Sequence, residues 1–397
     1  MKKALLTLFV IAAFISSAMA QNPDSIQGNT AQRLMAQNQK LSIGGYGTID
    51  YNQKLSNDEM STGKLDVHRM VLMFGYKFNP RTNFITELEL EHVSEVYVEQ
   101  AFLNYRINDY FNFRAGLMLI PMGITNEYHE PTTFNGVERP NIDKYIVPST
   151  WREVGAGFTG NIKEAYLKYQ VYLVNGFKSA SAGSDEASFT GKKGLRSGRQ
   201  KGAESISSAP NLSAKVDFYG VRGLKVGAAV YSGKSQSDRY NGVQTSDAAG
   251  LASADSSVVG VNMVGLDARY RRKGLQLKGQ VNMVKLSNTD QYNAYFGSDL
   301  GSELFGYLAE VGFNVLRKQP SKGQLIPFVR YEVYNTHNKV ASGTATNGAY
   351  NRTDLTLGLG WKITSGAMLK ADYQIMNNEI DGSDPTAQMN FGVAVWF

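Results

Sequence analysis

The feature that most constrains the fold of this chain is a long series of segments in which every second residue is apolar. Residues 352–363 are typical, because five apolar side chains from Leu355 to Ile363 alternate with polar residues and glycines. Successive side chains of a β-strand leave opposite faces of the sheet, so this period predicts strands with one apolar and one polar face. We predict sixteen strands, at residues 41–51, 65–78, 82–92, 96–107, 110–119, 152–160, 164–175, 211–218, 223–233, 261–270, 274–285, 303–316, 325–335, 352–363, 366–376 and 387–397.

The connections between these strands alternate in length. Those after even-numbered strands are short, such as Asn79-Pro80-Arg81 and Thr364-Ser365. Those after odd-numbered strands are mostly long, at 120–151, 176–210, 234–260, 286–302 and 336–351. A meander with all its long loops at one end is typical of a barrel in a membrane. The sequence therefore predicts an all-β fold, a 16-stranded antiparallel transmembrane β-barrel. The alternative is a secreted β-sandwich, which has no need of long loops on one side.

The last strand, MNFGVAVWF, runs to the final residue of the chain. An open sheet edge would leave backbone groups unpaired in lipid, so we expect this strand to pair with the first one. Its lipid-facing side chains should be Met389, Phe391, Val393, Val395 and Phe397. The mean hydropathy of −0.29 fits such a barrel, because half of each strand faces water. A terminal aromatic also resembles the assembly signal of bacterial outer-membrane barrels, so we expect the barrel assembly machinery to bind Phe397.

The N-terminus predicts export. Lys2 and Lys3 precede an apolar stretch, and Ala18-Met19-Ala20 forms a cleavage site, so residues 1–20 read as a signal peptide. The polar residues 21–40 are expected to form a periplasmic leader, and residues 41–397 the barrel in the lipid of the cell outer membrane. The chain has no cysteine. Its net charge is +6, or +4 without the two leading lysines, which is too mild for a nucleic-acid partner.

Sixteen strands enclose an aqueous channel, whereas eight fill themselves with side chains. The count therefore predicts a porin for small hydrophilic solutes. Loop three (120–151) should decide the width of this channel. It contains Pro121, Pro131, Pro140 and Pro148, which restrict the backbone. We expect the loop to fold inward and narrow the pore; the alternative is a loop that stays outside as a cap.

Three stretches around this loop resemble the phosphate-selective porin O and P family. They are RAGLMLIPMGITNE (114–127), TFNGVERP (133–140) and PSTWREVGAGFTG (148–160), and YLVNGF (172–177) is similar to the strand end of that family. The resemblance implies sixteen strands, a constriction at loop three, a homotrimer of separate pores and a preference for anions or phosphate. The chain departs from the family pattern at Leu119, where a lysine is common.

Charged side chains that line a pore set its selectivity. The strand pattern points Arg69, Arg106, Arg114 and Lys168 inward, and Glu87 and Glu89 lie on the strand between them. We expect an arginine track, completed by Arg139 and Arg152, that faces this acidic patch and binds small anions or other polar solutes. The alternative is that the charges only tie loop three to the wall through salt bridges. Further inward charges are expected at Glu91, Lys215, Asp217, Lys225, Asp267, Arg269, Lys278, Glu310, Arg330, Glu332, Asp354, Lys362, Lys370 and Asp372.

No residue pattern indicates an enzyme. The four histidines, His68, His92, His129 and His337, are scattered and show no spacing typical of a catalytic or metal site. We therefore expect no catalytic residue, no metal and no cofactor. Two other functions stay open, an adhesin that uses the long loops and a transporter of hydrophobic compounds. Liposome swelling with graded sugars separates both from a porin.

Overall fold

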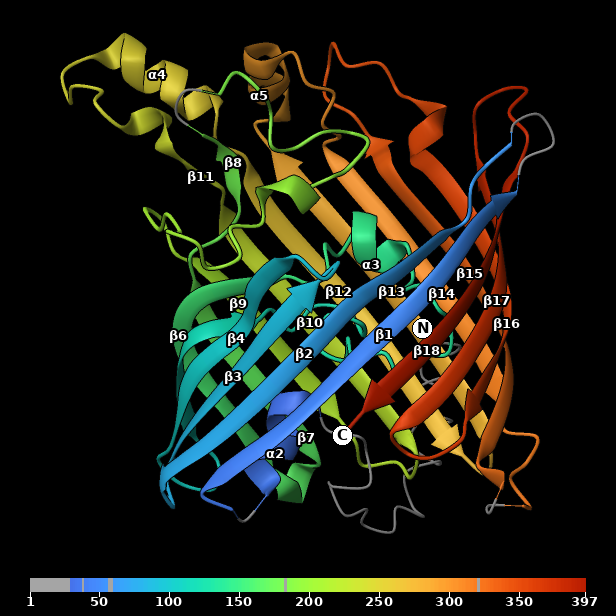
Figure 1. Ribbon diagram of the computed structural model, residues 1–397. Helices are drawn as coiled ribbons and strands as arrows, with labels where there is room; N and C mark the ends of the chain where they lie inside the picture. The colour runs from blue at the N-terminus through green and yellow to red at the C-terminus, as the bar shows by residue number, and fades with distance from the viewer. Residues whose placement is uncertain (1–28, 38, 56–59, 182–183, 320–321) are drawn as a thin grey trace, which may run out of the picture.

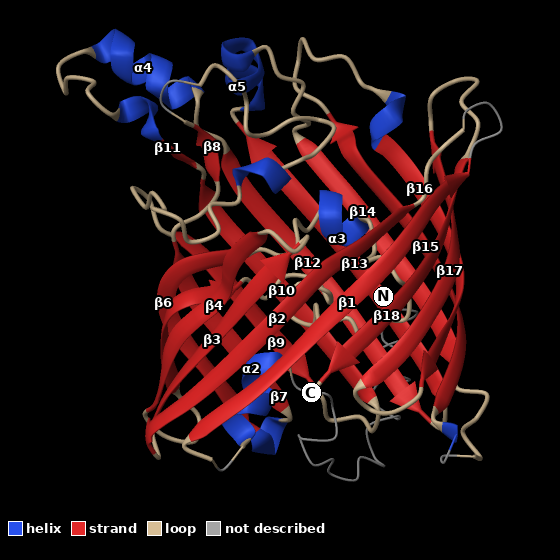
Figure 2. Ribbon diagram, in the orientation of Figure 1, coloured by secondary structure: helices blue, strands red, loops and turns tan. Residues whose placement is uncertain are grey.

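The protein forms a closed antiparallel barrel of sixteen strands (Figures 1 and 2). The structure, a computed structural model, describes residues 29–37, 39–55, 60–181, 184–319 and 322–397. The signal peptide predicted at 1–20 and the start of the leader lie outside these residues. The barrel strands are β1 (Leu41–Leu55), β2 (Lys64–Asn79), β3 (Thr82–Glu91), β4 (Glu95–Arg106), β5 (Asn112–Leu119), β6 (Arg152–Ile162), β7 (Leu167–Val174), β9 (Asn211–Phe218), β10 (Leu224–Lys234), β12 (Gly260–Arg272), β13 (Leu275–Ser287), β14 (Glu303–Phe313), β15 (Gln324–Lys339), β16 (Asn351–Lys362), β17 (Ala367–Asn378) and β18 (Thr386–Trp396).

All sixteen predicted strands are present, and their order in the barrel follows the chain. The largest difference at a strand start is in β7, which begins at Leu167 instead of 164. There, Lys163–Ala165 form the single-turn helix η3, and Tyr166 adopts a left-handed conformation with φ of 54°. The strand pattern continued through this turn, so periodicity alone did not mark the break.

The barrel closes between its first and last strands, as predicted. Tyr46 of β1 pairs with Trp396 of β18, and the register continues to Leu55 and Ala387. The Gly45 amide donates to the Phe397 carbonyl at 3.0 Å, and the Phe397 amide donates back at 2.9 Å. On the outer face of β18, Met389, Phe391, Val393 and Phe397 are exposed, and Val395 is half-buried. These apolar side chains give β18 an outer face suited to contact with lipid.

Loop three lies inside the barrel, which confirms the inward fold predicted for it. From Ile120 to Trp151 nearly every residue is buried, and the loop contains the short helix α3 (Ile142–Tyr145). Figure 1 shows α3 in the bore, below the long loops. The loop crosses the bore between the two walls of the barrel and therefore narrows it.

The other long connections gather at one end, which we call the loop end (Figure 2). The short turns mark the opposite end, the turn end. At the loop end, β8 (Lys178–Ala180) and β11 (Gln236–Ser237) form a small parallel sheet, close to α4 (Ala248–Ser256) and α5 (Thr289–Phe296). The remaining single-turn helices are η4 (Arg196–Gly198), η5 (Asp238–Tyr240) and η7 (Gly348–Tyr350).

One more helix, α2 (Thr30–Ala36), lies near the turn end and packs on β1, β2 and β3 (Figure 1). It belongs to the segment predicted as a polar leader. Among the described residues, no helix has both the length and the apolar composition needed to cross a membrane.

Candidate functional site

Loop three is attached to the inner wall through its backbone as well as through its side chains. Lysine side chains on β13, β16 and β17 donate to its carbonyls, and carboxylates on β15 and β17 accept from its amides. Hydrogen bonds to charged groups contribute about 1.5–3 kcal/mol each. The bonds are Lys362 Nζ to the Thr132 carbonyl (2.7 Å), Lys370 Nζ to Gly136 (2.8 Å), Lys278 Nζ to Thr133 (3.4 Å), the Val137 amide to Asp372 Oδ2 (2.6 Å) and the Ile142 amide to Glu332 Oε2 (3.0 Å).

Side-chain ion pairs add to this attachment. Lys215 Nζ on β9 lies 2.7 Å from Glu127 of the loop and 2.9 Å from Asp267 of β12. Gly306 of β14 makes room for α3, because it has no side chain. A Cβ at this position would lie 3.0 Å from Cγ1 of both Ile142 and Ile146. For the wall from β9 to β17, the charges therefore hold the loop, as in the alternative considered above.

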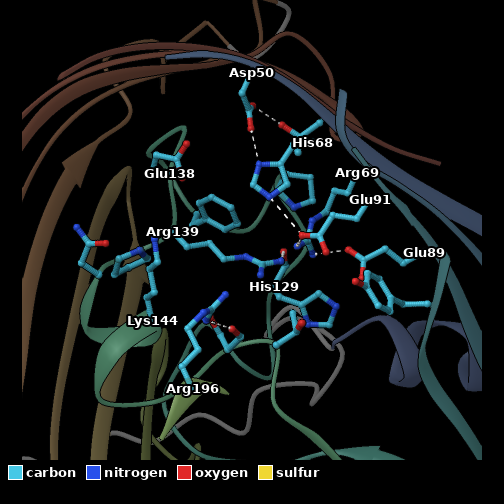
Figure 3. A pocket seen from close by; sticks show the side chains of 18 of the residues that line it. Asp50, His68, Arg69, Glu89, Glu91, His129, Glu138, Arg139, Lys144 and Arg196 are labelled. Atoms are coloured by element: carbon cyan, nitrogen blue, oxygen red, sulfur yellow. Dashed lines mark hydrogen bonds and ion pairs between the residues drawn. The ribbon is translucent and has the colours of Figure 1, made fainter. Parts of the chain in front are cut away.

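The opposite part of the bore contains a cavity of about 160 Å³ between loop three, loop four (176–210) and the inner face of β1 to β4 (Figure 3). Its charged lining has an acidic and a basic part. The acidic residues are Asp50, Glu89, Glu91 and Glu138, and the basic residues are Arg69, Arg139, Lys144, Arg152, Arg196, Arg199 and Lys201. Uncharged residues such as Tyr97, Phe134 and Val137 complete the lining.

The acidic side chains of this cavity all have partners. Arg69 Nη1 lies 3.2 Å from Glu89 Oε1, and Arg69 Nη2 lies 3.7 Å from Glu91. Asp50 lies 3.1 Å from Nδ1 of His68 and accepts from the Thr48 hydroxyl. Asn52 Nδ2 donates to Glu138 at 2.9 Å. Glu89 and Glu91 thus share one guanidinium group, whereas Glu138 accepts from an amide and Asp50 accepts from a hydroxyl and faces an imidazole.

The basic side of the cavity differs, because three guanidinium groups bind only backbone carbonyls. Arg139 Nη2 donates to His129 at 3.2 Å, Arg199 Nη1 donates to Ser149 at 2.8 Å, and Arg196 Nη1 also donates to Ser149. Within the described part of the chain, none of the three lies within 4.0 Å of a carboxylate. Their positive charge is therefore not neutralised by an ion pair.

Burial and neighbouring positive charges lower the pKa values of two of these loop arginines. Burial, followed by the charges of Arg196 and Arg152, lowers the pKa of Arg199 to about 9. Burial, followed by the charge of Arg69, lowers the pKa of Arg139 to about 10. Both groups stay charged at neutral pH, and an anion placed among them would relieve their repulsion.

A second cluster borders the cavity, where His129 of loop three lines it and contacts the wall. Its Nε2 atom lies 2.9 Å from Glu99 Oε2, 2.8 Å from the Tyr46 hydroxyl and 3.7 Å from Glu87 Oε2. Burial alone would lower the pKa of His129, but the charge of Glu99 and the hydrogen bonds to Glu87 and Glu99 raise it to about 10. Arg152 Nη1 lies 3.7 Å from Glu99 on the other side. His129 is therefore an imidazolium ion that holds the loop to β3 and β4.

Glu87, Glu99 and His129 are also the described residues whose ligand atoms could meet at one metal ion, since these atoms lie within 4.8 Å of one another. A metal there would have to displace the proton of an imidazole with a pKa of about 10. The geometry fits an ion pair better than a metal site.

The structure separates the site residues predicted from the sequence into two groups. Arg69, Arg139, Arg152 and Glu89 line the cavity, and Glu87 lies directly behind it. Arg106, Arg114 and Lys168 lie elsewhere. Arg106 is exposed at the turn end and pairs with Asp109, Arg114 lies 4.3 Å above the Phe102 ring and donates to Tyr172, and Lys168 lies 5.7 Å from the Tyr219 ring.

Sequence reasoning missed the contribution of loop four. Arg196, Arg199 and Lys201 line the cavity, as does Lys144 of α3. A signal was present, because GKKGLRSGRQKG (191–202) contains five basic residues and no acidic one. Its meaning depended on the path of the loop into the bore, which the sequence pattern does not give.

Comparisons with known proteins agree with this architecture. The family model of phosphate-selective porin O and P matches residues 42–390. An uncharacterized protein of Aquifex aeolicus (strain VF5) is 30% identical over 364 residues, which cover 89% of this chain and 80% of the relative.

Solved porins share the fold at low sequence identity. The outer membrane channel DcaP of Acinetobacter baumannii has a TM-score of 0.60 at 12% identity, over 90% of this chain and 97% of that one. An anion-selective porin from Comamonas acidovorans has a TM-score of 0.54 at 12% identity, over 90% and 99%. Salmonella typhi OmpF has a TM-score of 0.56 at 11% identity, over 90% and 97%. The family match and the closed barrel identify an outer-membrane porin. This chain belongs to the phosphate-selective porin O and P family.

Proposed function

We propose that this porin lets small hydrophilic solutes diffuse across the outer membrane and that it prefers anions. One observation carries the proposal. The cavity beside loop three is lined by seven basic and four acidic side chains, and three of the basic ones, Arg139, Arg196 and Arg199, bind only carbonyls. A solute in this cavity therefore meets uncompensated positive charge.

Guanidinium groups suit this task, because each offers several N–H donors in a fixed plane and grips carboxylate or phosphate oxygens in pairs. The cavity of about 160 Å³ has room for a small oxyanion and some water. Since the arginines come from two loops and β6 supplies Arg152, an anion would be held between loop three and loop four at the constriction.

Lysine side chains also lie on the other side of loop three. Lys278, Lys362 and Lys370 donate to carbonyls between Thr132 and Gly136. Phe134 and Val137 of the same segment line the cavity on the loop side. This wall is mixed in charge, because Lys278 Nζ also lies 3.2 Å from Glu310 and Asp372 accepts from the Val137 amide.

Which anion is preferred is a separate question. Leu119, which stands where the family commonly has a lysine, pairs with Arg152 at the end of β5 and is buried. The cations of the cavity come from the loops, β2 and β6 instead. We propose a general preference for small oxyanions, with phosphate as the first candidate to test.

The proposal also covers the assembly of the protein and its export. We propose a homotrimer of separate pores, as the family resemblance implies; OmpT of Vibrio cholerae, whose barrel is similar at a TM-score of 0.52, is described in a trimer form. We also propose cleavage after residue 20 and recognition of Phe397 by the barrel assembly machinery. Light scattering of the purified protein and N-terminal sequencing of the mature chain test the first two of these points.

The test of the pore function is electrical. Purified protein in a planar bilayer, with a KCl gradient across it, should give a reversal potential on the chloride side of zero. Added phosphate should then reduce the chloride current at concentrations that leave a cation-selective porin unaffected. A reversal potential on the potassium side would reject the anion preference, and the absence of channels would reject the porin function.

A further inference from the structure

The helix α2 occupies an unexpected place for a leader segment. Ala31 and Leu34 are buried, with exposures of 1% and 3%. They belong to one apolar cluster with Met73 of β2 and Ile85 of β3. On these strands the charged residues Arg69 and Glu89 and the apolar Met73 and Ile85 share the same parity, which faces the bore. The helix therefore lies inside the barrel.

Two glycines of the inner wall lie next to Leu34 of α2. A Cβ at Gly75 would lie 3.3 Å from Cβ of Leu34, and a Cβ at Gly44 would lie 3.9 Å from Cδ2 of the same leucine. A side chain at Gly75 would crowd Leu34, whereas a Cβ at Gly44 would be in ordinary van der Waals contact with it. The wall is thus shaped for the helix, and the apolar side chains around it would otherwise face the water of the pore.

The helix also reaches the last strand of the barrel. The guanidinium carbon of Arg33 lies 4.5 Å from the centre of the Trp396 ring on β18. Trp396 alternates with the lipid-facing residues of that strand, so its ring faces the bore. From inside, α2 therefore bridges the seam between β1 and β18, close to the turn end.

Arg33 brings a cation to this end of the pore. Its charge acts on Lys362, the last residue of β16, together with the charges of Arg271 and Lys278. These groups come from three different strands and one helix. They form the part of the bore that an anion would cross after it leaves loop three.

We propose that α2 narrows the pore at its turn end, which is the periplasmic exit, and contributes to the selectivity of the channel there. Within this helix, Arg33 is a further selectivity-determining residue of the pore. The proposal rests on the function proposed above, because it assigns a role in anion passage. It requires that α2 stays docked while the channel conducts.

The absence of native cysteines allows a direct test of the docking. Two cysteines at Leu34→Cys and Gly75→Cys would have Cβ atoms close to the separation found in disulfides, about 3.5–4.5 Å. Oxidation of the double variant in membranes should form this bond, seen by mass spectrometry of the linked peptides, whereas neither single variant should. The oxidised and reduced channels should conduct alike. If no bond forms in correctly folded barrels, α2 is not docked and the proposal fails.

The selectivity is tested by substitution of the cation itself. Arg33→Gln should lower the chloride-over-potassium permeability ratio about two- to threefold, the effect of one unit charge acting over several ångströms of water. Arg33→Lys should restore the ratio, and Lys40→Gln, outside the helix, is the matched control. Deletion of residues 29–37 should lower the ratio as well and raise the single-channel conductance. A conserved ratio in Arg33→Gln would show that α2 only supports the wall, and would overturn the proposal.

The two proposals fail in different ways. A wild-type channel without chloride preference rejects the function proposed for the whole pore. A wild-type channel with chloride preference, combined with an unchanged ratio in Arg33→Gln, rejects only the role of α2.

Discussion

Arg199 Nη1 of loop four donates to the Ser149 carbonyl at 2.8 Å and to the Thr150 carbonyl at 3.2 Å. The two loops that form the cavity are thus joined by a residue that also supplies its charge. Because both carbonyls lie directly before β6, the end of loop three is fixed at the point where Arg152 enters the cavity. Loop four therefore belongs to the constriction.

Arg199→Gln should weaken the anion preference. The variant loses one positive charge among crowded cations, so we expect the chloride-over-potassium ratio to fall about two- to threefold. Arg199→Lys keeps the charge and should keep most of the ratio. Lys193→Gln, an exposed basic residue of the same loop outside the cavity, is the control. If Arg199→Gln and Lys193→Gln give the same ratio as the wild type, loop four has no part in selectivity.

His129 should make the attachment of loop three sensitive to alkaline pH. The pKa of His129 in the folded protein, about 10, lies above its ordinary value of 6.5. A raised pKa means that the stabilisation is complete below about 6.5 and is lost as the pH rises through about 10. Thermal unfolding followed on unboiled gels from pH 6 to 11 measures this loss.

His129→Gln is the matched variant for that experiment. It removes a charge that two buried carboxylates share, and loss of one partner from a buried pair costs about 3–5 kcal/mol. The variant should be less stable than the wild type at pH 6, and the difference should shrink towards pH 11. A difference that is constant across this range would contradict the assignment of His129 as an imidazolium ion.

Gly306→Val should displace α3. The added atoms would overlap Ile142 and Ile146, and overpacking of this kind costs about 1–3 kcal/mol. Since α3 is part of the segment that narrows the bore, we expect a change in single-channel conductance and faster cleavage of loop three by protease. Gly279→Ala is the control, because the nearest heavy atom to its new Cβ lies 3.9 Å away. Equal conductance in both variants would show that loop three does not depend on this contact.

Asp372→Asn should loosen the loop at another point. The carboxylate accepts from the Val137 amide, and a hydrogen bond to a charged group contributes about 1.5–3 kcal/mol. We expect faster amide hydrogen exchange at residues 134–138, while exchange in the barrel strands stays unchanged. A uniform increase over the whole barrel would indicate loss of the fold instead of a local release.

The barrel could be predicted from the sequence because the alternation of apolar and polar residues along a strand is a local pattern. Residues two apart share a face, so strands such as β16 can be recognised without any knowledge of their neighbours. Closure followed from the physics of lipid, and Tyr46 does pair with Trp396. The break before β7 was missed, since the left-handed Tyr166 leaves the alternation intact.

The site was harder to predict, because parity gives the face of a residue but not its depth in the bore. Arg69 and Arg106 both follow the inward pattern, yet Arg69 lines the cavity and Arg106 is exposed at the turn end. The position of α2 was missed for a related reason. Val71, Leu72, Met73 and Phe74 are apolar on both faces of β2, which signals that something covers the inner face there, but not what covers it.

The most direct test of the cationic cavity compares two arginines that the sequence analysis assigned to the same arginine track. Arg139→Gln removes a guanidinium group from the cavity, and Arg106→Gln removes one from the turn end. Reversal potentials in a KCl gradient should show chloride preference in the wild type, a shift towards zero for Arg139→Gln and no shift for Arg106→Gln. Equal reversal potentials in all three proteins, or a larger shift for Arg106→Gln, would contradict the account.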